Sequence, residues 1–548
     1  AKETKKKKDD SKEGQKKSDE DHLKKAHESI SKKYDRYLER VAEKDQGDYL
    51  EKFFNSVSKI FDPHTNYLPP KKKEDFDIDI SGSLEGIGAV LQEDGPYIKV
   101  VQIVTGGAAW RQKGLEVDDK IIAVSQGDES EPVSLINMRV DDAVRYIRVE
   151  KGTLVKLTVK KASGAREVVP IVRDVVQLQA SYAKSSVLEH KEIGVKLGYI
   201  KVPKFYRDFG SSDKNVTEDV RKELKRLKEK KVEGLILDLR NNGGGALEDA
   251  RKMSGLFIKK GPIVQVRDHA GNIDILKDSN EDVEYDGPLI VLVNRFSASA
   301  SEIVAAAMQD YDRALVVGGG YTHGKGTVQV VLNLNQGPLL SMFGPTMGAL
   351  KVTVQKFYRI NGGSTQYKGV KPDIILPDPM GYTENREQDL EYSLKWDATK
   401  KVDYSKWDKF SFDLDKLKKK SAKRVKKDKR FQKVTNLVNY LKKERKDTSI
   451  SLNLKKIQKE EKEKEKKLEK FEIKDENENI LISNYEASLK EHENIREDDM
   501  KQWKKDFKQR KTDWSEQLRK DAIIQESLYL AKDLIEQIKT DKLSMRRK

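Results

Sequence analysis

Short apolar runs alternate with stretches of helical period between residues 193 and 377. The runs expected to form strands are 198–202, 234–239, 289–293, 314–317, 328–334 and 352–358, and the expected helices are 216–228, 246–257 and 301–311. Strands separated by helices of this length are typical of a layered α/β domain. The alternation therefore predicts a mixed α/β fold for the centre of the chain.

The segments on either side of this core differ from it in pattern. Residues 1–20 are almost all charged or small and are expected to be disordered. Residues 21–78 carry apolar side chains at helical spacing, whereas 79–176 contain short β-type runs broken by Gly and Pro, with one helix at 140–149. Residues 397–548 are charged and helix-forming, which leaves 177–396 for the core. The predicted fold class is multidomain α+β.

Charge composition suits contact with an anionic surface but does not identify one. The 548 residues include 108 Lys and Arg against 92 Asp and Glu, so the formal net charge is +16. Residues 416–433 concentrate eleven Lys and Arg residues against the single acid Asp428. Because of this run, the hypothesis that the protein binds nucleic acid or an envelope polymer stays open. A recognisable nucleic-acid motif and interleaved aromatic residues are missing, so a solvated helical face is the preferred interpretation and nucleic acid is not an expected partner.

Two absences from the sequence exclude further classes. The chain contains no cysteine, which excludes disulfides, thiolate catalysis and Cys-ligated zinc. It also contains no apolar run of about 18 residues, so neither a transmembrane segment nor an uncleaved signal peptide is predicted. The sequence is therefore expected to be a mature or truncated form of an exported protein, or a cytosolic protein.

The strongest local signal for chemistry is a serine-rich turn. The apolar run 289–293 leads through Ser297, Ser299 and Ser301 into an apolar helix, which places a serine at a helix N-terminus. Free backbone N–H groups and the helix dipole favour negative charge there, so the turn can hold a nucleophile and half of an oxyanion hole. The alternative is that these serines only cap the helix.

Two glycine-flanked segments could complete such a site. Gly243, Gly244 and Gly245 lie between an expected strand and an expected helix, where backbone N–H groups are accessible and could supply the second oxyanion donor. A phosphate cradle is the alternative, although the loop has no Walker lysine and does not match GxGxxG. Lys325 stands between two glycines, and a desolvated lysine with its pKa lowered toward roughly 7–8 can act as the base for a serine. A surface lysine is the plainer interpretation.

At this point six motifs can be compared with a known family. They are DPHTNYL at 62–68, LEGIGAVL at 84–91, LDLRNN at 237–242, FSASASEI at 296–303, GKGTVQ at 324–329, and KFY, GV and PD between 356 and 373. In this order they resemble the C-terminal processing, or tail-specific, serine proteases of bacteria, above all the long periplasmic members.

The resemblance implies roles for particular residues. Ser299 falls on the family's nucleophile, Lys325 on its general base and Gln329 on a glutamine that assists the lysine. The oxyanion hole falls on the N–H of Ala300 together with that of Gly244 or Gly245. Because the sequence shows no metal-ligand cluster and a neutral amine is the expected base, neither a metal nor another cofactor is expected.

One loop departs from the family pattern. Residues 318–325 are one residue longer than usual and carry His323, which is the rival base for the serine.

The family also has a longer helical N-terminal region, so the chain is expected to begin inside it. For Lys325 and Gln329 to cooperate at a spacing of four, we expect 324–329 to form a turn of helix, since i and i+4 are neighbours only there.

The β-rich module resembles a PDZ domain. Gly86, Ile87, Gly88 and Ala89 form a small-residue loop before a strand, and open N–H groups beside a strand edge can capture a peptide carboxylate. The alternative is that these glycines only make a turn. The expected partners are protein substrates with accessible, apolar C-termini, and an envelope adaptor protein is a further candidate partner.

The leading hypothesis is thus a serine endopeptidase that recognises C-terminal tails. The alternatives are a catalytically inactive PDZ adaptor and an envelope-polymer binding protein. The resemblance implies a location in the periplasm or cell envelope of a Gram-negative-type bacterium, with the signal peptide absent from this chain.

Overall fold

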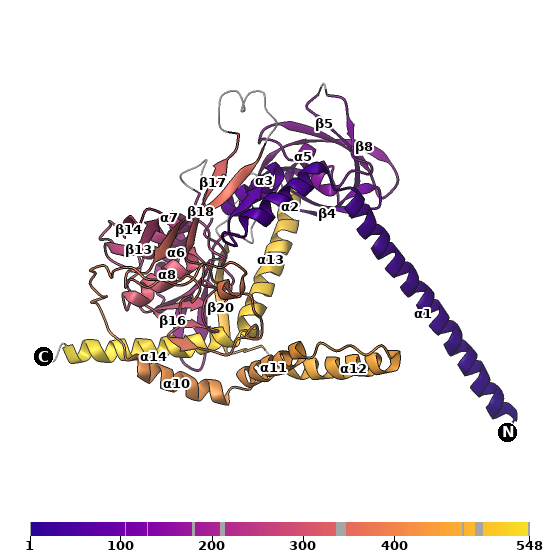
Figure 1. Ribbon diagram of the computed structural model, residues 1–548. Coiled ribbons are helices and arrows are strands. Elements are labelled where there is room, and N and C mark those ends of the chain that lie inside the picture. The colour runs from indigo at the N-terminus through magenta and orange to yellow at the C-terminus, as the bar shows by residue number, and fades with distance from the viewer. Residues whose placement is uncertain are drawn as a thin grey trace. The chain divides into compact units, whose positions relative to one another are not determined.

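The computed structural model describes residues 2–104, 106–128, 130–177, 181–208, 214–335, 347–473, 476–487 and 497–545 (Figure 1). The chain divides into two compact units, residues 1–73 with 331–352, and residues 74–330 with 353–548. Residues 2–20, for which the sequence predicts a disordered tail, are the first part of a helix that runs from Lys2 to Ala42, and their side chains lie outside the described part. No helix in the described ranges is long and apolar enough to cross a membrane.

The first unit is mainly helical. It contains α1 (Lys2–Ala42), α2 (Gln46–Ser58) and β1 (Asn66–Leu68), and α3 (Pro70–Ser81) begins at its end. α2 starts at a capping box in which Asp45 and Asp48 each accept from the other's backbone N–H. β1 pairs antiparallel with residues 349–351, the start of β18 (Ala349–Tyr358). The helical subdomain predicted near the N-terminus is confirmed.

The β-rich module consists of two antiparallel sheets. The larger contains β3 (Ala89–Asp94), β4 (Tyr97–Ile103), β5 (Lys120–Gln126), β6 (Val133–Ser134), β7 (Leu154–Lys160) and β8 (Arg166–Val172). The smaller pairs β2 (Ser83–Gly86) with β9 (Asp174–Gln177). The helices are α4 (Ala108–Gln112) and α5 (Val140–Ile147). Alternating buried positions such as Val155, Leu157 and Val159 fill one core, as the period of two predicts.

The α/β core is built on a seven-stranded sheet in the order β19-β16-β15-β12-β11-β10-β20. These strands are β10 (Lys184–His190), β11 (Val195–Lys201), β12 (Gly234–Asp238), β15 (Leu289–Val293), β16 (Leu315–Gly318), β19 (Ile374–Ile375) and β20 (Ile480–Ala487). From β11 to β19 the neighbours run parallel. A second sheet contains β13 (Gly261–Asp268), β14 (Ile273–Asp278), β17 (Thr327–Asn333) and β18. The predicted multidomain α+β class with a mixed α/β core is confirmed.

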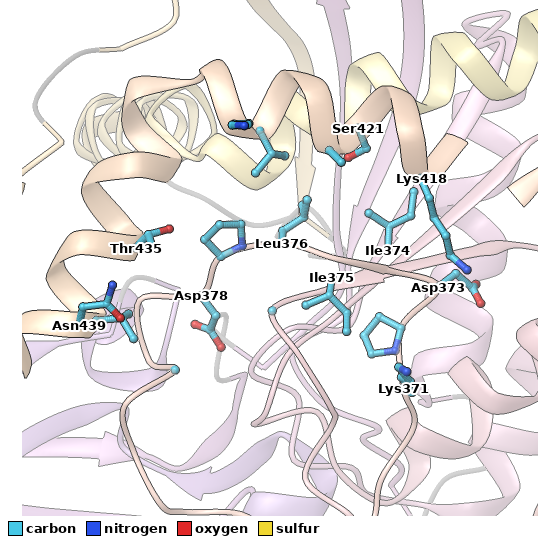
Figure 2. A pocket seen from close by; sticks show the side chains of 18 of the residues that line it. Lys371, Asp373, Ile374, Ile375, Leu376, Asp378, Lys418, Ser421, Thr435 and Asn439 are labelled. Carbon is cyan, nitrogen blue, oxygen red and sulfur yellow. The ribbon is translucent and has the colours of Figure 1, made fainter. Parts of the chain in front are cut away.

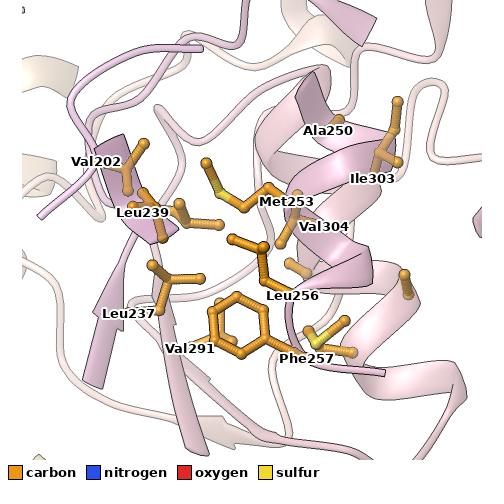
Figure 3. Packing of buried hydrophobic residues seen from close by; sticks show 14 of the residues in the cluster. Val202, Leu237, Leu239, Ala250, Met253, Leu256, Phe257, Val291, Ile303 and Val304 are labelled. Carbon is orange, nitrogen blue, oxygen red and sulfur yellow. The ribbon is translucent and has the colours of Figure 1, made fainter. Parts of the chain in front are cut away.

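Alternating residues of the central strands enter two different cores. On β15, Val291 packs under α6 (Val216–Glu229), α7 (Leu247–Gly255) and α8 (Ala300–Asp310), whereas Leu292 enters the opposite core. Figure 3 shows the first of these cores, where Leu237 and Val291 of the sheet meet Met253 and Phe257. Because both faces are covered, the strands read as continuous apolar runs.

The C-terminal region supplies the cover for the second face. It contains the short 3₁₀ helix η1 (Glu387–Asp389), α10 (Leu414–Lys427), α11 (Lys429–Lys446), α12 (Leu454–Phe471), α13 (Glu497–Lys520) and α14 (Ala522–Met545). Leu528, Leu530 and Leu534 of α14 are buried in the core of that face. The sequence interpretation of an all-helical region is wrong in one respect, because β20 pairs antiparallel with β10 at the sheet edge. Its partner lies about 290 positions earlier, so local periodicity could not reveal the pairing.

Part of the basic run 416–433 is neutralised inside this region. Arg424 contacts Glu526 at 2.8 Å and Asp533 at 2.7 Å, and Lys420 contacts Asp533 at 2.6 Å. One face of α10 therefore pairs with acids of α14, which agrees with a structural role for these cations rather than binding of an anionic polymer.

Candidate active site

Ser299 occupies a strained position between β15 and α8. Its φ is 55° and its ψ is −114°, a conformation that a residue with a side chain adopts only at a cost of about 1–3 kcal/mol. The surrounding turn enforces it, because the Ser299 N–H donates to Glu302 and the Ala298 N–H donates to the Asn242 carbonyl at 3.0 Å. A serine on a sharp strand-to-helix turn exposes its Oγ, as a nucleophile requires.

The neighbouring serines serve the fold. Ser297 is fully buried, and its hydroxyl donates to the Leu239 carbonyl at 2.9 Å. Ser301 is also fully buried and donates to the Asn242 carbonyl at 2.9 Å. Ser299 alone of the three is partly accessible, which agrees with its selection as the candidate nucleophile.

The glycine loop packs directly against this serine. A Cβ on Gly244 would lie 2.8 Å from the Ser299 Cβ, and a Cβ on Gly245 would lie 2.1 Å from the Phe205 carbonyl oxygen. Both positions therefore need glycine for close approach rather than for a turn alone. The two loops that sequence reasoning assigned to the site are brought together here.

The structure distinguishes between the oxyanion donors that sequence reasoning left open. The Gly244 N–H donates to the Asn242 side chain at 2.9 Å and is already used. Within the described residues, the N–H groups of Ala300 and Gly245 have no acceptor. The Gly244 alternative is thus disfavoured, and Ala300 with Gly245 is the pair available to a developing oxyanion.

Glu302 joins the serine turn to the lysine loop. Its Oε2 accepts from the N–H of Ser299 at 2.8 Å and of Lys325 at 2.9 Å. Its Oε1 accepts from the Gly324 N–H at 2.7 Å and from the Thr322 hydroxyl. One buried carboxylate therefore fixes the backbone of both candidate catalytic residues, and sequence reasoning assigned it no role.

The protonation of Glu302 is finely balanced. Complete burial raises the pKa of Glu302 to about 7, although the hydrogen bonds from Thr322, Ser299 and Gly324 favour the charged form. Protonation would convert one of its acceptor oxygens into a donor and would break at least one of these bonds. We therefore expect the hydrogen bonds that hold the two loops to depend on pH near neutrality.

The helical turn expected for 324–329 is wrong. Gly324 has a φ of +99°, residues 324–326 are irregular, and Thr327 begins β17. The extended form is favoured by the β-branched residues of β17, such as Thr327 and Val328. The Phe357 N–H also donates to the Gly326 carbonyl at 2.9 Å. The Gln329 amide nitrogen donates to Thr327 at 2.8 Å and to Thr353 at 3.1 Å. Its assistance to Lys325 stays a prediction.

The imidazole of His323 contacts a buried carboxylate of the C-terminal region. Its Nε2 lies 3.5 Å from Oε2 of the buried Glu387, and its backbone N–H donates to the Ser297 carbonyl at 3.0 Å. The longer loop thus places His323 against Glu387, and the choice between His323 and Lys325 as the base stays a prediction.

The candidate peptide-binding loop retains open donors. Gly86 ends β2, Ala89 begins β3, and the carbonyls of Ile87 and Gly88 accept from Ala109 and Val104. Within the described ranges, the N–H groups of Ile87 and Gly88 have no acceptor. β3 is also an edge strand, so one side of it can receive an added strand.

Four family models cover most of the chain. Residues 196–376 match peptidase family S41, 77–160 match the PDZ domain, 2–71 match the tail specific protease N-terminal domain, and 380–536 match the C-terminal domain of tail specific protease. A carboxyl-terminal-processing protease of Picosynechococcus is 30% identical over 339 residues, which are 61% of this chain and 75% of that protein. The chain belongs to the C-terminal processing proteases of peptidase family S41.

Two other relatives of this S41 peptidase cover 78% and 58% of the chain. The tail-specific protease of Haemophilus influenzae is 37% identical over 432 residues, which cover 78% of this chain and 60% of that protein. CtpA of Bacillus subtilis is 33% identical over 58% of this chain and 61% of its own length. The chain thus spans about three fifths of each of these two relatives.

Among solved structures, the photosystem II D1 C-terminal processing protease is 24% identical, with a TM-score of 0.34, over 62% of this chain and 86% of its own. The PDZ domain of a Vibrio cholerae carboxy-terminal protease, solved with a peptide, is 42% identical, with a TM-score of 0.17. The match covers 18% of this chain and 99% of that domain's chain.

A cluster of buried charges lies at the base of the glycine loop of this S41 peptidase. Asp238, at the end of β12, accepts from Tyr199 at 2.7 Å and contacts Lys201 at 3.1 Å and Arg240 at 2.7 Å. Burial alone would raise the pKa of Asp238, but Arg240 and Lys201 outweigh it and hold that pKa well below its usual range. Two cations thus surround one fully buried anion.

Asp521 supplies the missing negative charge. It accepts from Ile523 at 2.8 Å at the start of α14, and its Oδ2 contacts Arg240 at 2.7 Å. Arg240 stands two residues before Asn242, whose side chain holds Gly244. The charge of the cluster balances only when α14 is in place.

We expect Asp521→Asn to lower kcat about tenfold with little change in KM, because Arg240 and the glycine loop lose a fixed position. The free energy of unfolding should fall by about 2 kcal/mol, since Asp521 is partly exposed. Steady-state kinetics and urea denaturation measure both, with Asp521→Glu expected to recover part of the rate. An unchanged kcat in a destabilised Asp521→Asn protein would restrict Asp521 to a folding role.

Proposed function

We propose that this S41 peptidase is a serine endopeptidase that cleaves proteins captured by their C-terminal tails. Ser299 is the nucleophile and Lys325 the general base. The observation that carries this proposal is the carboxylate of Glu302, which holds the backbone N–H of Ser299 and that of Lys325 on one oxygen atom. Packing of the core alone does not require a strained serine and a lysine loop to be held by one buried carboxylate. Such an arrangement is typical of a catalytic site.

The proposed reaction proceeds by acyl transfer. Neutral Lys325 accepts the hydroxyl proton of Ser299 while Oγ attacks the carbonyl carbon of the scissile peptide bond. The N–H groups of Ala300 and Gly245 stabilise the oxyanion, and the lysine returns the proton to the leaving amine as the C–N bond breaks. Water, deprotonated by the same lysine, then releases the acyl group and regenerates Ser299.

Tail recognition is proposed for the PDZ domain. The open N–H groups of Ile87 and Gly88 suit a terminal carboxylate, and the free edge of β3 beside α5 suits an extended chain. An apolar final residue would place its side chain between β3 and α5. The long tail-specific members that this chain resembles suggest a location in a bacterial cell envelope, where an adaptor protein could deliver substrates.

The base can be identified by comparing two neighbours in one loop. We expect Lys325→Ala to lower kcat by about 10⁴-fold or more, because one member of a catalytic unit is lost, while His323→Ala retains most of the activity. Wild-type kcat should rise with pH as the amine loses its proton. Cleavage of an unstructured protein with an apolar C-terminus is the measurement. A loss in His323→Ala as deep as in Lys325→Ala would assign a Ser–His mechanism, and tail binding without turnover would indicate an inactive adaptor.

Capture of the tail can be separated from chemistry by the substrate. We expect amidation of the C-terminus to raise KM about tenfold or more for a tailed protein and to leave cleavage of a short internal peptide unchanged. Gly88→Trp should also raise KM for the tailed protein. Gly88 has a φ of +77°, and a Cβ at this position would lie 3.0 Å from the Cα of Gly107, so a side chain would distort the loop. Circular dichroism checks that the variant folds. Equal effects on both substrates would show that the PDZ domain is not the tail reader.

A further inference from the structure

A groove of about 1000 Å³ lies beside the last strand of the seven-stranded sheet. Its floor is β19 and the segment that follows, through Asp378 (Figure 2). α10 and α11 form its other wall, where Val425 and Val438 provide apolar surface. The groove has no part in the catalytic arrangement described above.

The floor of the groove is a sheet edge. β19 pairs with β16 on one side and ends the strand order, so among the described strands its other side has no neighbour. Ile375 on this strand is 52% exposed. An edge strand with an exposed β-branched residue is a template for an additional strand, unless a neighbouring segment covers it.

The cations of the groove are available, whereas its anions are not. Four lysines line it: Lys371, Lys418, Lys426 and Lys442. Within the described ranges, Lys371, Lys426 and Lys442 lack an ion-pair partner, whereas Lys418 contacts the exposed Asp415 at 4.0 Å and also interacts electrostatically with Asp373 of the groove.

The two acids of the groove have partners inside the fold. Asp373 accepts from Gln309 at 2.7 Å and from the Val316 N–H at 2.8 Å, and Asp378 contacts Arg295 at 3.5 Å. The open charge of the groove is therefore positive.

We propose that this groove binds an extended acidic segment of a protein substrate, which adds to β19 as an edge strand. Three of the lysines lie on α10 and α11 with Val425 and Val438, so the side of the added strand that meets these helices would place acidic side chains near the lysines and aliphatic groups near the valines. The origin of the segment in a substrate rests on the proposed endopeptidase function, but the groove and its charge do not.

A peptide accounts for the groove better than nucleic acid does. None of the residues that line the groove is aromatic, so it offers no stacking platform for bases. A sheet edge instead matches the backbone N–H and C=O groups of an extended chain. A second contact of this kind would increase retention of a substrate whose C-terminus is held elsewhere, since two linked contacts bind more tightly than either alone.

The test uses the full chain with Ser299→Ala, so that nothing is cleaved, and fluorescence anisotropy. The labelled peptide is a ten-residue repeat of Glu and Val with an amidated C-terminus, which the PDZ domain should not capture. We expect saturable binding that weakens with salt and that falls at least tenfold in the double variant Lys418→Glu/Lys426→Glu.

Lys419→Glu/Lys423→Glu is the matched control. It changes the charge of the same helix by the same amount, at exposed positions that do not line the groove, and should alter the affinity by less than about threefold. Ile375→Asp, which places a like charge on the edge itself, should also weaken binding.

Three results would overturn the proposal: no saturable binding of the peptide, equal losses in the two double variants, or unchanged binding by Ile375→Asp. The proposed function is judged separately, from cleavage of a tailed protein by the wild type. A protein that binds the amidated peptide but cleaves nothing would remove the endopeptidase and leave the groove assignment intact.

Discussion

Ser299→Ala will abolish proteolysis, with kcat reduced by about 10⁵-fold, and will leave the fold intact. The side chain is only partly buried, and alanine tolerates the φ of 55° no worse than serine does. The loss is therefore chemical. Turnover of a tailed protein by purified variant and wild type, together with circular dichroism, measures the two effects separately.

The neighbouring serines provide the control. Ser297→Ala and Ser301→Ala each remove a buried hydroxyl that donates to a backbone carbonyl, so each should cost about 1–3 kcal/mol of unfolding free energy. Below their unfolding temperatures both variants should retain activity. If Ser301→Ala is inactive while Ser299→Ala turns over, the nucleophile is Ser301.

Glu302→Gln will lower kcat about 100-fold, because the buried carboxylate accepts four hydrogen bonds and an amide can accept at only one of its two atoms. The N–H groups of Ser299 and Lys325 share a single carboxylate oxygen in the wild type, so the variant should loosen the two loops together. KM should change much less, since Glu302 is fully buried beneath the site.

The same residue predicts a dependence on pH. Its pKa is raised from 4.5 to about 7, so the folded protein binds this proton more tightly than the unfolded chain does. The resulting contribution to stability is complete below pH 4.5 and is lost as pH rises through 7. Activity moves in the opposite direction, because only the carboxylate accepts all four bonds, and kcat should fall as pH drops through about 7.

A comparison with another α8 acid separates stability from activity. Asp310 lies at the opposite end of the helix and contacts Arg359 at 2.6 Å. Asp310→Asn should destabilise the protein while keeping the wild-type pH profile, whereas Glu302→Gln should lose the component near pH 7. A Glu302→Gln protein with the wild-type rate and profile would contradict a positioning role for Glu302.

Local pattern in the sequence determined much of the architecture. The apolar runs that became β12 and β15 were recognisable because both faces of their sheet are buried, and the turn between β15 and α8 was recognisable from its small residues. The sequence placed Ser297, Ser299 and Ser301 at a helix start and Lys325 between two glycines, and the family resemblance then selected Ser299 among the serines. Family motifs strengthened both assignments.

Long-range contacts determined the rest. Whether Gly244 or Gly245 can serve the oxyanion depends on the Asn242 side chain, and the strand from Thr327 depends on pairing with β18. β20 pairs with β10 and Asp521 contacts Arg240, and both of these partners lie more than 200 positions earlier in the chain.

Glu302 shows the difference most clearly. In the sequence it is one acid among many in a first helical turn, where a glutamate is ordinary. Only the folded chain buries it completely and brings donors from both catalytic loops to its two oxygens. Burial and hydrogen bonding together set its pKa and its role, and both depend on residues that the sequence keeps more than twenty positions apart.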